Sequence, residues 1–146
     1  MRRMLSPDPL RLVAFDEDDL AVISTHLQDA EVKPTDIVFL PKERRFVLVA
    51  ARFDWCAAQG GELRRREAGL HFERVLSVRR SHFDQAAATP STLIAIRFDV
   101  EAPPAGVVTL RFADGSAIRL EVECLEAAMK DLGPVWSCEA APAHSH

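Results

Sequence analysis

The chain has 146 residues, of which 48% are hydrophobic and 27% charged, with a formal net charge of -4. This length suits one domain, and the composition is too apolar for a disordered chain. Apolar runs are only a few residues long, which excludes a membrane-spanning helix. Residues 1–5 resemble the basic start of a signal peptide, but prolines at positions 7 and 9 interrupt it. A cytoplasmic location is therefore expected.

The first predicted elements are a strand and a helix. Apolar residues alternate over residues 10–15, as in a half-buried strand. The acidic residues 16–19 suit the first turn of a helix, because carboxylates are favourable at the positive end of the helix dipole. Apolar residues then recur at helical spacing: Leu20, Ile23, Leu27 and Ala30. This pattern predicts a helix over residues 18–30 with Asp16 as its cap.

A first block of strands is predicted after this helix. Residues 37–40 form a strand that turns into a longer one at residues 46–55, and the pair is a hairpin. Gly60 and Gly61 mark the next turn. Two further strands are then predicted, at residues 62–66 and 70–80, hinged near residues 68–69. The patternless residues 81–91 end this block.

One pattern occurs twice, once in each block. LVAARFDW at residues 48–55 and LIAIRFDV at residues 93–100 carry Leu, Ala, Arg, Phe and Asp at matching positions. The two-residue period of a strand places the phenylalanines toward the core and the arginines toward solvent. The residues concerned are Phe53 and Phe98, and Arg52 and Arg97. The two copies are therefore predicted as central strands of two antiparallel blocks; the alternative is that each Arg-Phe-Asp triplet is a binding motif.

The loop between the strands at residues 107–112 and 117–122 can be predicted from side-chain parity. Residues directly opposite each other in an antiparallel pair lie on the same side of the sheet. A two-residue loop would put the two apolar faces out of step. The pattern therefore favours a three-residue loop with Gly115 in the left-handed conformation and Leu110 opposite Ile118.

The end of the chain predicts a helix. Four apolar residues stand at i, i+3, i+4 and i+7: Leu125, Ala128, Met129 and Leu132. Gly133 and Pro134 end this helix. The predicted fold is α+β and mostly antiparallel: a split barrel of about seven strands with an N-terminal strand-helix extension and a C-terminal helix. It forms a single domain at residues 1–136, followed by a flexible tail at residues 137–146.

Two resemblances accompany these patterns. The order of four strands, three strands and a helix over residues 37–132 resembles pleckstrin-homology-like split barrels, in which the helix plugs one open end. At the level of sequence, four segments resemble a family of short bacterial proteins known as domain of unknown function 2948. These are LRLVAFD, DAEV, FVLVAARFDW and ERVL, at residues 10–16, 29–32, 46–55 and 73–76. That resemblance implies a stand-alone cytoplasmic protein and transfers no functional residue.

No catalytic or metal-binding motif is present. The sequence has no nucleophile motif and no phosphate-binding glycine-rich loop, and its histidines at positions 26, 71 and 82 are scattered. Its three cysteines are widely spaced, which favours neither a disulfide framework nor a zinc site: Cys56, Cys124 and Cys138. A site of Cys138, His144 and His146 would lie in the flexible tail. We therefore predict no cofactor, no metal and no enzymatic activity; the alternative is a small enzyme that uses Cys56 and a histidine.

The middle of the chain is basic. Residues 42–82 contain ten Lys and Arg against five Asp and Glu, which leaves a charge of -9 for the remainder. Arginines gather at the ends of predicted strands, which can converge on one rim of a barrel: Arg44, Arg45, Arg64, Arg65, Arg66, Arg79 and Arg80.

Such a rim suits an anionic small molecule, a lipid headgroup or an acidic protein partner. The predicted function is accordingly a non-catalytic binding or adaptor module. The alternative is that the arginines are solvated strand ends of a purely structural interaction protein. Nucleic acid is not expected, because the total charge is acidic and no basic stripe is interleaved with aromatics. The sequence leaves the oligomeric state open.

Overall fold

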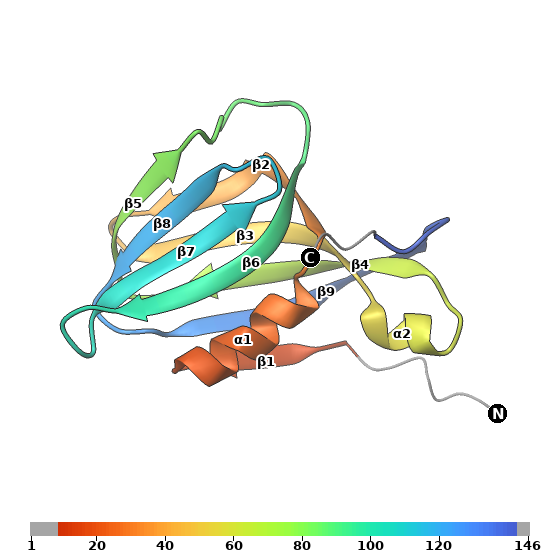
Figure 1. Ribbon diagram of the computed structural model, residues 1–146, viewed down its shortest axis with the longest axis horizontal. Helices are drawn as coiled ribbons and strands as arrows, with labels where there is room; N and C mark the ends of the chain where they lie inside the picture. Colours follow the sequence, from red (N-terminus) through yellow and green to blue (C-terminus); the bar gives the residue numbers. More distant parts are fainter. Residues whose placement is uncertain (1–8, 143–146) are drawn as a thin grey trace.

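The computed structural model describes residues 9–142. Within these residues, nine strands form one antiparallel sheet in the order β1-β9-β4-β3-β2-β6-β7-β8-β5 (Figure 1). Two short helices accompany the sheet. In chain order the elements are β1 (Arg11–Ala14), α1 (Glu17–His26), β2 (Ala30–Leu40), β3 (Arg45–Phe53), α2 (Trp55–Gln59), β4 (Arg64–Phe72), β5 (Val75–Ser81), β6 (Ser91–Val100), β7 (Gly106–Phe112), β8 (Ala117–Val122) and β9 (Ala127–Ser137).

The sheet bends at β2. This strand pairs with β3 over most of its length but with β6 only through residues 30–32. The bend separates a first half, β1-β9-β4-β3-β2, from a second half, β6-β7-β8-β5, and the two halves curve around one core (Figure 1). Helix α1 packs against β6 and β1 and buries Leu20 and Ile23 in that core. The prediction of a mostly antiparallel α+β fold is confirmed, with nine strands instead of seven. The sheet is not closed, because the edge strands β1 and β5 do not pair with each other.

The N-terminal strand and helix are confirmed, although the helix is shorter than predicted. Asp16 caps α1: the Asp19 N–H donates to Asp16 Oδ1 at 2.8 Å. The helix ends at His26 because Asp29 takes the left-handed conformation, with φ of 63°, and Ala30 already begins β2.

The predicted C-terminal helix is wrong. The segment forms β9, an eleven-residue strand that lies between β1 and β4 and is hydrogen-bonded to both. Ala127 and Met129 are buried, whereas Lys130 is exposed, so the helical spacing of the apolar residues also contained a two-residue alternation. Pairing on both sides satisfies the backbone of β9, and this tertiary context overrides the local pattern. The helix that plugs a pleckstrin-homology-like barrel is therefore replaced by a strand, and that layout is not confirmed.

The first block is also divided differently from the prediction. Strand β4 continues through the predicted hinge at residues 68–69, and the chain reverses after Phe72, where Arg74 has φ of 59°. Strand β5 then pairs with β8 and joins the second half of the sheet. The short helix α2 was not predicted. It begins where Asp54 accepts the N–H of Ala57 at 3.0 Å.

The inward face of β3 is the opposite of the predicted one. The buried residues of this face are Phe46, Leu48, Ala50 and Arg52. Phe53 is buried as predicted, because α2 folds back and the Trp55 ring packs edge-on against the Phe53 ring. The centroids of the two rings are 4.5 Å apart. Phe98 is only partly buried, so its predicted full burial is wrong, whereas Arg97 is exposed as predicted. Both faces of β3 are apolar, and parity alone could not choose between them.

The loop between β7 and β8 is confirmed. Leu110 lies opposite Ile118, and Gly115 has φ of 90°. The Phe112 N–H donates to the Ser116 carbonyl, and the Gly115 N–H donates to the Phe112 carbonyl, both at 3.0 Å. These bonds close the three-residue loop.

Replacing Gly115 with alanine is expected to lower the free energy of unfolding by about 1 kcal/mol, because a Cβ is penalised at this φ. No atom lies within 4 Å of the added Cβ, so no clash adds to the loss. Urea denaturation measures the effect. Gly60→Ala is the matched control, since Gly60 has an ordinary φ of -94°. Equal losses in the two variants would contradict the expectation.

The predicted tail at residues 137–146 is described as far as Pro142. The Cys138 N–H donates to the Leu63 carbonyl at 3.0 Å, so backbone pairing continues just beyond β9. His144, His146 and the signal-like residues 1–5 lie outside the described residues. No helix in the described part of the chain is long and apolar enough to cross a membrane.

Candidate functional site

The arginines of the predicted rim lie in separate places. Strands β3 and β4 are antiparallel, and Phe53 at the end of β3 lies opposite Arg65 at the start of β4. Arg44 and Arg45 stand at the other end of this pair. Nine residues of strand separate the two ends by roughly 25 Å. The predicted arginines therefore do not converge on one rim, and that prediction is wrong.

Two of these arginines are paired with carboxylates at the surface. Arg44 Nη1 lies 3.1 Å from Glu123 Oε1, and Arg45 Nε lies 2.8 Å from Glu73 Oε2. Both arginine side chains are about half exposed, so these ion pairs contribute little to stability. Their charges are nevertheless partly neutralised.

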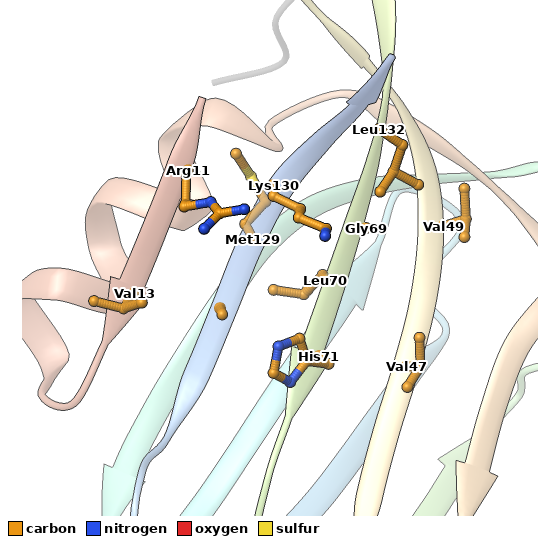
Figure 2. Close-up of a pocket in the computed structure, with 11 residues that line it drawn as sticks. Arg11, Val13, Val47, Val49, Gly69, Leu70, His71, Met129, Lys130 and Leu132 are labelled. Carbon is orange, nitrogen blue, oxygen red and sulfur yellow. The ribbon is translucent and has the colours of Figure 1, made fainter. Parts of the chain in front are cut away.

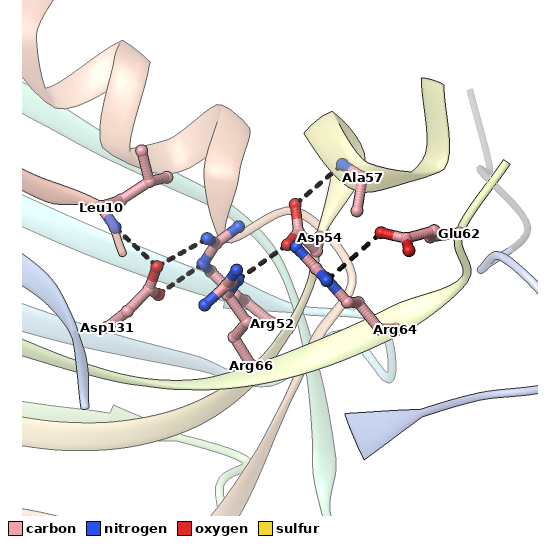
Figure 3. Close-up of polar contacts among 8 residues, drawn as sticks. All are labelled: Leu10, Arg52, Asp54, Ala57, Glu62, Arg64, Arg66 and Asp131. Atoms are coloured by element: carbon pink, nitrogen blue, oxygen red, sulfur yellow. Dashed lines mark hydrogen bonds and ion pairs between the residues drawn. The ribbon is translucent and has the colours of Figure 1, made fainter. Parts of the chain in front are cut away.

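The arginines that begin β4 turn toward protein groups, and Figure 3 shows two of them, Arg64 and Arg66. Arg66 Nε donates to Asp54 Oδ2 at 2.7 Å, and Arg64 Nε donates to the same oxygen at 3.1 Å. Arg65 donates to the Ala51 carbonyl at 2.8 Å. Asp54 is fully buried, and Arg66 nearly so. Arg64 and Arg66 thereby hold the N-terminus of α2 to the end of the sheet, because Asp54 caps this helix.

A second buried ion pair lies beside the first. Arg52 is 1% exposed, and its Nε and Nη2 donate to the two carboxylate oxygens of Asp131, both at 2.8 Å (Figure 3). The Leu10 N–H donates to Asp131 Oδ2 at 2.7 Å. This bidentate geometry ties the centre of the sheet to β9 and to the residue that precedes β1.

The carboxylates of both pairs are held in the charged form. Burial raises the pKa of Asp131, but the hydrogen bonds from Arg52 and Leu10 and the charges of Arg52 and Arg66 outweigh it and lower the pKa. Burial likewise raises the pKa of Asp54, and its bonds from Arg66, the Ala57 N–H and Arg64 lower it further than burial raises it.

His26 lies near these pairs, at the end of α1. Burial lowers its pKa, and the positive charge of Arg52 lowers it further, against the smaller raising effects of Asp131 and Asp54. The imidazole is therefore neutral at pH 7.

Cationic side chains that lack such partners are found on the outer face of the second half of the sheet. Arg79 on β5 lies opposite Arg119 on β8, Arg119 lies opposite Thr109 on β7, and Thr109 lies opposite Arg97 on β6. Opposite residues share a face, and Arg111 shares it because it follows Thr109 by two positions. We call this surface the arginine face; its residues are Arg79, Arg97, Arg111, Arg119 and Thr109.

The cations of the arginine face are exposed and largely unpaired. Arg97 lies 3.7 Å from Asp99, and both side chains are well exposed. The side chains of Arg79, Arg111 and Arg119 form no ion pair or hydrogen bond with residues 9–142. Like charges directly opposite each other across a strand pair are destabilising. An arrangement of like charges that costs stability and has no carboxylate partner among the described residues is typical of a binding site.

A groove of about 450 Å³ runs over this face. Its lining includes three arginines and one carboxylate, together with Thr109 and two residues of the β7–β8 turn: Arg97, Arg111, Arg119, Asp99, Gly115 and Ser116. Side chains opposite each other are about 5 Å apart and diagonal ones 7–8 Å apart, so neighbouring guanidinium groups can reach one anionic group. Guanidinium groups are suited to carboxylates and phosphates because they donate two parallel hydrogen bonds.

Sequence reasoning identified one member of this face, Arg79, and its neighbour Arg80, which donates to Gln85 at 2.9 Å. It missed Arg111 and Arg119 as site residues and weighed Arg97 only within the alternative Arg-Phe-Asp motif, because each of these arginines stands alone in an alternating strand. The sequence could have indicated them, because all three arginines occupy outward positions of strands whose inward and outward faces could be predicted from alternation.

The alternative catalytic pair has no support in the geometry. Cys56 is exposed on α2 and forms no hydrogen bond with a histidine among residues 9–142. His71, on β4, instead has its Nδ1 atom 2.7 Å from Glu73 Oε2. Within the same residues, no group of three or more His, Cys, Asp or Glu side chains could hold a metal ion.

A family model described as protein of unknown function (DUF2948) matches residues 10–144. The chain belongs to this family. The resemblance seen in its sequence segments is thereby confirmed at the family level. A search of curated proteins and a search of solved structures give no match. Membership of DUF2948 assigns no residue a role, so the arginine face rests on geometry and charge.

Proposed function

We propose that this protein is a non-catalytic binding module that holds an acidic segment of a protein partner on the arginine face. The observation that carries the proposal is the row of exposed arginines across β6, β7, β8 and β5, three of them unpaired in the described chain. Four strands at about 4.8 Å spacing spread this charge over roughly 14 Å. That span exceeds a single phosphate and suits several carboxylates along one segment.

The electrostatic consequence is salt-sensitive association. Exposed charges attract a ligand of opposite sign over about 8 Å at physiological ionic strength, and the attraction weakens as salt rises. The net charge of the whole chain is negative, but it does not prevent association with an acidic ligand. At physiological ionic strength, charges farther away than the screening length are largely screened, so the ligand responds mainly to the nearby arginines. We expect the arginine face to raise the association rate as well as the affinity.

The proposal is tested by binding of a fluorescent poly-glutamate peptide, followed by anisotropy at increasing salt. Arg111→Glu together with Arg119→Glu is expected to weaken binding by about tenfold or more. Both side chains are exposed, so the double variant should change the free energy of unfolding by less than about 1 kcal/mol.

Arg44→Glu is the matched control, since Arg44 is exposed, paired with Glu123 and not one of the residues of the arginine face. It should leave peptide affinity unchanged. Equal affinity of the wild type and the double variant would overturn the proposal. Inorganic phosphate serves as a competitor: displacement of the peptide at low phosphate concentration would favour a small anion as the ligand.

A further inference from the structure

The arginine face is centred on Thr109 of β7. The residues directly opposite Thr109 are Arg97 on β6 and Arg119 on β8, and Arg111 follows two positions later on β7 itself. Side chains opposite each other are about 5 Å apart, and side chains two positions apart on one strand are separated by roughly 7 Å. Three guanidinium groups therefore stand around one threonine.

The floor between these arginines is built of short side chains. The residues opposite Arg111 on its two neighbouring strands are both alanines, Ala95 and Ala117, so no long side chain stands between the arginines. Thr109 is half-buried, and its hydroxyl forms no hydrogen bond with the part of the chain that the structure describes. The groove is thus open above Thr109 and surrounded by cationic donors.

Three guanidinium groups around one point favour a phosphate over a carboxylate. A carboxylate is planar and has two oxygen atoms, so two guanidinium groups already satisfy it. A phosphate monoester presents three terminal oxygens and a charge of about -1.5 to -2 at pH 7. Each oxygen can accept hydrogen bonds from a different arginine, and the Thr109 hydroxyl can donate one from the floor of the groove.

The next outward row of the sheet sets the direction of a bound segment. This row carries two carboxylates, Asp99 and Glu121, one on each side of Val107. These carboxylates repel an acidic segment that runs along the strands. A segment that crosses the strands from Thr109 toward the sheet edge meets Arg79 on β5 instead, after two strand spacings or about 10 Å. Three extended residues span this distance.

We infer that the acidic segment is phosphorylated, and that its phosphoserine or phosphothreonine side chain lies over Thr109 among Arg97, Arg111 and Arg119. This inference rests on the proposed function, because it specifies the ligand of the same site. The phosphate occupies the centre of the arginine face, and a carboxylate about three residues away pairs with Arg79. Charge-assisted hydrogen bonds to guanidinium groups supply the affinity for the phosphate.

An exposed pair of cations on the other half of the sheet lacks these features. Arg11 on β1 lies opposite Lys130 on β9, beside a groove of about 460 Å³ (Figure 2). The far side of this groove is apolar and includes Val49 and Leu132, and none of the residues that line it carries a hydroxyl group. Arg11 and Lys130 therefore provide a charge-matched control for the arginine face.

The experiment compares three fluorescent poly-glutamate peptides by anisotropy. They differ only at one central position, which is phosphoserine, glutamate or serine. The phosphoserine peptide is expected to bind wild type about tenfold more tightly than the glutamate peptide, and the serine peptide most weakly. Inorganic phosphate should displace the phosphoserine peptide only at concentrations about 100-fold above the Kd of that peptide, because it lacks the flanking carboxylates.

Two variants retain the fold and test the geometry. Thr109→Val removes the hydroxyl and keeps a β-branched side chain, and Arg111→Lys keeps the charge but loses the fork of parallel donors. Each should lower the preference for phosphoserine over glutamate about threefold or more. Thr109→Val should leave the affinity for the glutamate peptide unchanged, because it removes no charge.

Two controls separate this site from general charge effects. Thr92→Val alters a half-buried threonine of β6 that lies outside the arginine face, and it should leave all three affinities unchanged. Arg11→Glu together with Lys130→Glu changes the net charge as much as Arg111→Glu together with Arg119→Glu does. It should also leave the three affinities unchanged, and circular dichroism checks that each variant is folded.

The outcomes distinguish this inference from the proposed function. Equal affinities for the phosphoserine and glutamate peptides would overturn the inference and leave the proposed function in place. Absence of binding by all three peptides would overturn both. A phosphoserine preference that Thr109→Val and Arg111→Lys leave intact would also overturn the inference, as would competition by inorganic phosphate near the Kd of the phosphoserine peptide.

Discussion

Replacing Asp131 with alanine is expected to lower the free energy of unfolding by about 3–5 kcal/mol. The substitution removes the only carboxylate that Arg52 contacts among the described residues and leaves a buried guanidinium without compensation. An unpaired buried charge costs far more than the pair contributes, because both ions lost their hydration when the protein folded. Urea denaturation at pH 7, where Asp131 is ionised, measures the loss.

The double variant Arg52→Met with Asp131→Leu distinguishes the cost of an orphaned charge from the cost of lost packing. Apolar residues of similar volume often replace a buried ion pair with little loss, so most of the stability should return. Asp99→Ala is the surface control, since Asp99 and Arg97 are both exposed, and it should cost less than about 1 kcal/mol. A small loss on Asp131→Ala would show that water reaches Arg52.

Phe53→Ala is expected to cost about 3–5 kcal/mol, and Phe98→Ala about 1–2 kcal/mol. Phe53 is 0% exposed and packs against Trp55, so its removal opens a cavity between β3 and α2. Phe98 is partly exposed, and water can replace part of its ring. The two residues occupy matching positions of the repeated pattern, which makes them a controlled comparison. Equal losses would contradict the difference in burial.

The parts of the fold that depend on local chemistry could be predicted from the sequence. The cap of α1 needs only an acidic residue before a helical pattern, and the loop at Gly115 follows from the parity of two neighbouring strands. The faces of β3 could not be predicted in this way, because Val47 and Val49 on one side are as apolar as Phe46 and Leu48 on the other. The residue that decides the face is Asp131, which lies 79 positions after Arg52 in the sequence. Its carboxylate pairs with the buried guanidinium of Arg52 and so compensates the loss of hydration of an inward arginine.

The C-terminal segment shows the same limit. Its apolar residues fit both a helix and a strand. The segment forms strand β9 because it can pair with the edges of β1 and β4 on its two sides. The site was found in part: Arg79 was singled out, but Arg64 and Arg66 are bound by Asp54, a contact that no spacing in the sequence indicates. Combining outward parity with the strand order would have placed Arg97, Arg111 and Arg119 on one face.

The bend at β2 places the arginine face on the second half of the sheet alone, and the outer surface of the first half points away from it. A partner held on the arginine face, as proposed, would therefore leave the outer surface of the first half open to solvent. Occupation of one half and accessibility of the other are independent of each other in this fold.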